Sequence, residues 1–127
     1  MKTFFAPPER SDDQQLRKHV DLVSGSPLVG GLMQAVNGLL AVLNEQRQIL
    51  ALNQTLLDLL GVGEADEVLG LRLGEAVRCV HAQDPPAGCG TTEYCTSCGA
   101  AIAMVTSLRV DAPRERDCAV TVERGGV

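Results

Sequence analysis

The chain has 127 residues, enough for one domain with a modest core. Hydrophobic residues make up 45% of it and charged residues 21%, as in globular proteins, and the net charge of −5 argues against nucleic acid or anionic lipid as a partner. No apolar run approaches the roughly 18–20 residues that span a bilayer, so we expect no membrane insertion. The first ten residues lack the apolar stretch of a signal peptide, and we expect a cytoplasmic protein.

Residues 1–25 are polar and mixed in sign, and we expect a flexible N-terminal arm there. A short helix is predicted within the arm through the apolar residues Leu16, Val20 and Val23. His19 in the same stretch is expected to lie in solvent.

Residues 26–37 predict a helix, because Ser26 can cap its start and Pro27 has the φ of a first helical residue. An apolar stripe runs along it and beyond: Leu28, Leu32, Ala35 and Leu39. Two interpretations stay open, a helix that covers the core and a helix that forms a dimer interface.

Two apolar runs, 39–43 and 49–52, flank the polar turn 44–47 and predict a β-hairpin. A short helix is predicted next, with Asn53 as its cap and Gly61 at its exit. The stretches "GEADEVLG" and "LGEAVRCV" predict two further one- or two-turn helices.

After a cysteine-rich stretch, "GAAIAMVTSLRV" predicts a longer helix that Gly99 opens, and "RDCAVTVE" alternates in the period-two pattern of a strand. Cys118 in this strand is expected to be a small core residue. The order of elements predicts an α+β fold with an antiparallel sheet that has short helices on one face and is preceded by an N-terminal helix.

Residues 38 to 78 resemble the first half of a PAS sensor domain. They begin with the sequence "GLLAVLNEQRQILALNQTLLDLLGVGEADEVLGLRLGEAV". The likeness rests on an opening hairpin, an N-capped helix that ends in "LLG", and short helices with a glycine step. Residues 99–122 resemble that family's later helix and next strand. The resemblance implies a sensory signalling domain over residues 38–127, with the cysteine-rich stretch 79–98 as an insert.

PAS domains usually complete their sheet with three strands after the long helix, whereas one strand remains here. The sheet is therefore expected to be truncated at the C-terminus, with its last strands missing. Either the chain is a fragment of a longer signalling protein, or another chain fills the open sheet edge.

Cys79, Cys89, Cys95 and Cys98 follow the spacing C-x9-C-x5-C-x2-C. Such grouped thiols in a chain expected to be cytoplasmic indicate a metal centre, a reversible disulfide switch or inert thiols. Four thiolates can hold zinc or an iron–sulfur cluster. The resemblance favours an iron–sulfur cluster over zinc, because some PAS-like sensors carry oxygen-responsive clusters. His81 could replace one cysteine or donate a hydrogen bond to the centre; the alternative is a solvated loop histidine.

No catalytic constellation is present in the sequence, so no enzyme is predicted. The enzymatic alternative is Cys95 as a nucleophile or a redox-active Cys95–Cys98 pair. The leading hypothesis is a sensory module whose four cysteines bind a metal centre and pass redox or oxygen state to a partner output domain, with the module as a homodimer. The alternatives are a zinc-stapled interaction domain and a thiol/disulfide switch without metal.

Overall fold

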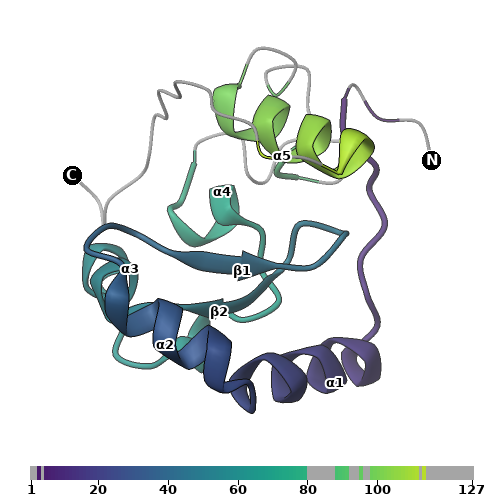
Figure 1. Cartoon of the computed structure of the whole chain (residues 1–127). Helices are drawn as coiled ribbons and strands as arrows, with labels where there is room; N and C mark the ends of the chain where they lie inside the picture. The colour runs from purple at the N-terminus through teal and green to yellow at the C-terminus, as the bar shows by residue number, and fades with distance from the viewer. Residues whose placement is uncertain are drawn as a thin grey trace. The chain divides into compact units, whose positions relative to one another are not determined.

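A computed structural model describes Thr3, residues 5–79, residues 88–91, Cys95, residues 98–111 and Pro113. Over these residues the fold is α+β, with helices and a two-stranded antiparallel sheet (Figure 1). The chain divides into two compact units. We call Arg10–Arg72 the hairpin unit, and Met1–Glu9 with Leu73–Val127 the thiol unit, because the latter holds the clustered cysteines.

The first helix of the hairpin unit is α1, Asp13–Ser24. The Asp12 carboxylate accepts a hydrogen bond from the Gln15 N–H at 2.8 Å, which caps the helix. The helix contacts β2 through its less exposed side, which carries the three apolar residues that predicted it. The helix predicted within residues 1–25 is therefore confirmed.

The second helix, α2, spans Pro27–Ala35 and begins as predicted, with the Ser26 side chain accepting from the Val29 N–H at 3.4 Å. None of its residues is buried. Leu28 is 74% exposed and Leu32 49% exposed. The helix thus leaves apolar side chains exposed.

The predicted hairpin is present as β1, Ala41–Leu43, and β2, Ile49–Leu52, paired antiparallel with an irregularity between Val42 and Leu43. Asn44 shapes the turn, because its Oδ1 accepts from the Gln46 N–H at 3.0 Å and from the Gln48 N–H at 2.8 Å.

Helix α3, Gln54–Leu60, follows the hairpin. Asn53 caps it by accepting from the Leu56 N–H at 3.1 Å, and Gly61 ends it with a left-handed φ of 72°. A short 3-10 helix, η1, spans Ala65–Glu67. The buried apolar core of this unit consists of Ile49, Leu50, Leu52, Leu56, Leu57 and Val68.

Two arginines in the hairpin unit are buried, which the polar turn pattern did not predict. Arg47 is 2% exposed, and Arg72 is fully buried. The Arg72 Nε donates to the Gln46 carbonyl at 3.0 Å, which connects the end of the unit to the hairpin turn.

The thiol unit contains α4, Leu73–Ala76, and α5, Gly99–Val110. Helix α5 begins at Gly99, as predicted. The strand expected around Cys118, and with it the predicted truncation of the sheet, lies outside the described residues. Over the described residues, every helix is too short or too polar to cross a membrane.

Candidate thiol centre

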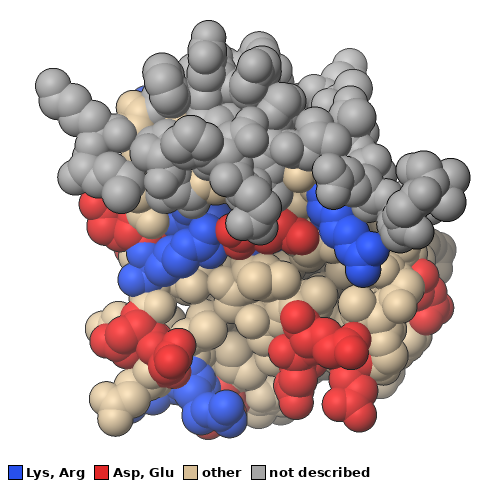
Figure 2. Space-filling view, turned by 180° about the vertical axis from the view of Figure 1, so that it is seen from behind, with Lys and Arg blue, Asp and Glu red and all other residues tan. Residues whose placement is uncertain are grey.

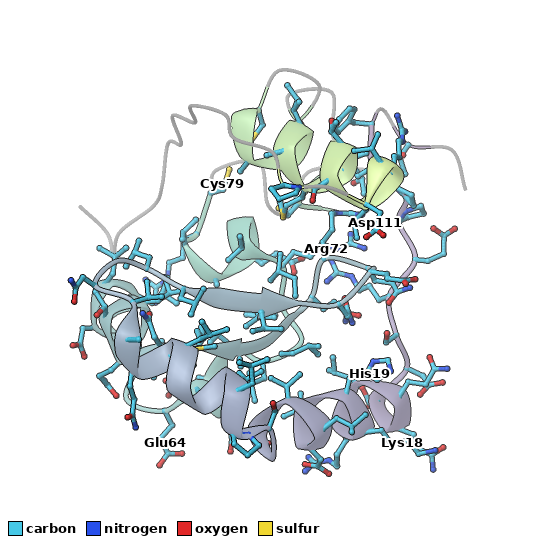
Figure 3. The ribbon with its side chains drawn as sticks, in the orientation of Figure 1. Lys18, His19, Glu64, Arg72, Cys79 and Asp111 are labelled. Atoms are coloured by element: carbon cyan, nitrogen blue, oxygen red, sulfur yellow. The ribbon has the colours of Figure 1, made fainter. Side chains whose placement is uncertain are left out.

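The chain reaches Cys79 through a Schellman motif that ends α4. The Cys79 N–H donates to the Gly74 carbonyl at 2.7 Å, and the Arg78 N–H donates to the Glu75 carbonyl at 3.3 Å. This pattern needs a left-handed residue before Cys79, and Arg78 has φ 61°. Because Arg78 has a Cβ, that conformation carries a backbone strain of about 1 kcal/mol. The motif holds Cys79 just beyond α4 (Figure 3).

Gly74 is the point on α4 that Cys79 and Cys89 both approach. A Cβ built on Gly74 would lie 2.7 Å from Cys89 Sγ and 3.5 Å from Cys79 Cβ. Schellman motifs often have an apolar contact between the residues that stand here as Cys79 and Gly74. Because residue 74 has no side chain, the Cys89 sulfur occupies the space that a side chain would fill.

Cys89 lies in a tight turn, residues 88–91. The Thr91 N–H donates to the Gly88 carbonyl at 3.0 Å, and the Thr91 Oγ1 donates to the same carbonyl at 2.7 Å. Gly90 has φ 88°, the left-handed value that the third residue of a type II turn requires. The Gly90 carbonyl accepts from the Ala6 N–H at 2.7 Å. Thr91 and Ala6 are fully buried, so the turn is fixed inside the thiol unit.

Cys95 and Cys98 connect this turn to α5. The Gly90 N–H donates to the Cys95 Sγ at 3.2 Å, a bond buried from solvent. The Cys98 N–H donates to the Cys95 carbonyl at 3.2 Å, and Cys98 is the N-cap residue of α5. Backbone N–H groups on sulfur are among the contacts that tune thiolate metal centres, and a helix N-terminus favours negative charge nearby.

The structure therefore brings Cys79 and Cys89 together at Gly74, and it links the turn that holds Cys89 to Cys95 and, through the backbone, to Cys98. Cys95 is buried, and Cys79, Cys89 and Cys98 are partly exposed. None of these four is in a disulfide. Over the described residues, no three Cys, His, Asp or Glu side chains are arranged to hold a metal ion. The described thiols are thus linked through shared contacts and do not form a metal site as they stand.

The candidate ligand His81 and the expected core residue Cys118 lie outside the described residues. His19 is exposed on α1, as predicted (Figure 3).

The sequence does not mark out Gly74 or Arg78. The glycines that flank the cysteines, Gly88, Gly90 and Gly99, are expected from the sequence to turn backbone N–H groups toward sulfur, and the Gly90 N–H does so. The signal available for Gly74 was its place inside the predicted short helix "LGEAVRCV", where glycine is a poor helix former and so needs a packing reason. No local pattern marks Arg78 as left-handed, because that conformation follows from the Schellman bonds.

Comparison with known proteins yields no match among protein-family models, curated proteins or solved structures. The resemblance to PAS domains consequently stays a prediction, and function has to be argued from the thiol centre itself.

Proposed function

We propose that the chain is a PAS-like sensory module whose four cysteines, Cys79, Cys89, Cys95 and Cys98, bind a soft metal centre. The observations that support this proposal are the shared approach of Cys79 and Cys89 to Gly74 and the Gly90 N–H bond to the Cys95 sulfur, with Cys98 joined to Cys95 through the backbone. An iron–sulfur cluster is the first choice and zinc the second, because thiolates prefer soft metals and only the cluster responds to redox state or oxygen. No catalytic role is proposed.

Metal binding would bring the sulfurs into their final arrangement, because the site is not preformed. Each cysteine side chain turns about a single side-chain bond, so small rotations can redirect the sulfurs. Metal binding would then order the segment around them, and the binding free energy would add to the stability of the thiol unit. A bound metal would add charge to the site, and an iron–sulfur cluster would in addition take up and release an electron reversibly.

Helix α5 is the element through which the state of the centre would reach a partner output domain. Its N-cap is Cys98, and the Cys98 carbonyl accepts the Ile102 N–H at 2.9 Å. Movement of Cys98 on binding or oxidation would therefore shift the first turn of α5. A cytoplasmic location belongs to the same proposal, because a reducing compartment keeps the thiols available.

A dithiol switch is the second candidate, favoured by the shared approach of Cys79 and Cys89 to Gly74. In that case the two thiols would lose two electrons and two protons to a small-molecule disulfide such as oxidised glutathione. One S–S bond would form between Cys79 and Cys89, and the oxidant would be reduced to two thiols.

The test is purification of the full chain without air, followed by elemental analysis and absorption spectroscopy. Iron, acid-labile sulfide and visible charge-transfer absorption are expected. One equivalent of zinc and no visible absorption would mean that the chain is a zinc-stapled domain and does not carry an iron–sulfur cluster. Absence of metal together with a Cys79–Cys89 disulfide in oxidised glutathione would support the switch, and absence of both would overturn the proposal.

We also propose that the module is a homodimer through the apolar face, defined as Leu28, Leu32, Val36 and Leu39, which are 74%, 49%, 37% and 53% exposed. The sequence from Leu22 to Asn44 contains no charged residue. Elsewhere, acidic and basic side chains are interspersed on the surface that Figure 2 shows. A chain of net charge −5 repels its own copies, so a self-interface is favoured where charge is absent.

A further inference from the structure

We infer that Gly74 is a positioning residue of the thiol centre: its missing side chain keeps the Cys89 sulfur against α4, beside Cys79. The consequence of this inference for metal binding rests on the proposed function. The geometric part, that residue 74 controls the position of the Cys89 sulfur, does not depend on a metal.

The reason for a glycine at this position is space and not backbone conformation. Gly74 lies within α4 and is not among the residues with positive φ. Glycine in a helix is less favourable than alanine by about 0.8–1.0 kcal/mol, so this position gains nothing locally from glycine. What it gains is the close approach of Cys89, whose Sγ and Cβ would lie 2.7 Å and 3.2 Å from an added Cβ.

The methyl group of an alanine at position 74 would clash with Cys89 before any other residue. A separation of 2.7 Å between a methyl carbon and sulfur is far below van der Waals contact. The cheapest relief is rotation of the Cys89 side chain, because its backbone is held in the turn of residues 88–91. That rotation moves Sγ off the surface of α4 at Gly74, the point that Cys79 also approaches. The Cys79 Cβ, at 3.5 Å, is at ordinary contact distance and can stay.

The control variant is Gly30→Ala. Gly30 also lies in a helix, and a Cβ there would meet nothing within 4 Å. Both substitutions therefore bring the same gain in helix propensity, and only Gly74→Ala introduces a contact with sulfur.

The first measurement is iodoacetamide labelling of the reduced, metal-free full chain, with each cysteine quantified by peptide mass spectrometry. We expect Gly74→Ala to raise the labelling rate of Cys89 relative to Cys98, whereas Gly30→Ala leaves the ratio at the wild-type value. An unchanged ratio in Gly74→Ala would overturn the inference, whether or not the protein binds metal.

The second measurement repeats the labelling with Zn²⁺ and titrates Co²⁺ as a spectroscopic probe. In wild type, Zn²⁺ should protect all four cysteines. In Gly74→Ala, Cys89 should stay reactive and affinity should fall by about 10- to 100-fold, the usual loss when a supporting contact of a metal ligand is removed. If wild type gains no protection, the metal proposal fails while the first measurement still decides the role of Gly74. If Gly74→Ala binds as wild type does, Gly74 does not position a ligand.

Because Gly74→Ala could unfold the thiol unit, Gly74→Ala is also compared in a Cys89→Ala background. Removing the sulfur removes the 2.7 Å contact. Gly74→Ala should therefore lower the urea concentration at the midpoint of unfolding by less in this background than in wild type. An equal loss in both would show that the clash is not with the Cys89 sulfur and would overturn the inference.

Discussion

The hairpin unit and the thiol unit are stabilised by different kinds of contact. The hairpin unit buries large aliphatic side chains, whereas among the described residues of the thiol unit the buried side chains are small: Ala6, Thr91, Cys95 and Val105. Large aliphatic side chains contribute about 1.5–3 kcal/mol each when buried, and small ones much less. The described part of the thiol unit instead depends on glycine turns, backbone hydrogen bonds and sulfur. We therefore expect it to gain most from a metal or a cross-link.

The strongest way to break the hairpin unit is to remove its most buried aliphatic side chain. Ile49→Ala is expected to lower the free energy of unfolding by about 2–5 kcal/mol, because Ile49 is fully buried and its loss leaves a cavity. Urea unfolding followed by circular dichroism measures the change. The control is Leu59→Ala in α3, at a side chain 53% exposed, with an expected change within about 0.5 kcal/mol. Similar losses in both variants would show that burial of Ile49 does not organise this unit.

Asn53 offers a second, smaller way to weaken the hairpin unit. Its Oδ1 accepts from the Leu56 and Leu40 N–H groups at 3.1 and 3.2 Å, and its Nδ2 donates to the Gly38 carbonyl at 2.8 Å. Asn53→Ala removes all three bonds at a buried site and is expected to cost about 2–3 kcal/mol.

Asn53→Ser separates these contributions, because a serine oxygen still accepts at the N-cap of α3 and the short side chain loses the amide bond to Gly38. Its expected cost is about 1 kcal/mol in the same urea experiment. If the serine variant were as unstable as the alanine variant, the cap would contribute little and the bonds to Gly38 and Leu40 would account for the effect.

These two regions also differ in how far the sequence predicted them. The hairpin, the Asn53 cap, the Gly61 exit and the start of α5 at Gly99 were all predicted, because each depends on a local pattern or on one residue's own conformational preference. The division of the chain after Arg72 was not predicted. The buried arginines were not predicted either, because a charged residue is buried only where distant groups satisfy it, and a local pattern does not contain those groups.

In the thiol unit, the sequence predicted which residues make the candidate centre but not how they meet. The spacing of the cysteines identified them as a group. Their arrangement depends on a strained Arg78, on the Gly90 N–H and on the missing side chain of Gly74. Arg78 and Gly90 act through hydrogen bonds with nearby residues, and only Gly74 acts through a contact with a residue far along the chain. Spacing alone carries no information about such contacts.

The strain at Arg78 can be relieved to stabilise the thiol unit locally. Arg78→Gly removes the Cβ from a left-handed residue and is expected to strengthen the Schellman motif by about 1 kcal/mol. Hydrogen exchange of the Cys79 amide, which bonds to the Gly74 carbonyl, should slow by about fivefold. Arg78→Ala keeps the Cβ and should exchange as wild type does. Faster exchange in Arg78→Gly would mean that the arginine side chain, and not the backbone, secures this turn.

The smallest expected change in stability, and the sharpest test of the proposed dimer, is the double substitution Leu28→Ser with Leu32→Ser. Both side chains are largely exposed, so the unfolding free energy of the monomer should change by less than about 1 kcal/mol. Sedimentation equilibrium should nevertheless show a dimer for wild type and a monomer for the variant. The matched control is Leu59→Ser, which removes an equally exposed leucine outside the uncharged segment and should stay dimeric. A monomeric wild type, or an equal effect of Leu59→Ser, would mean that the apolar face does not join two copies. The hairpin unit would then be stabilised by its own core alone, without help from a second chain.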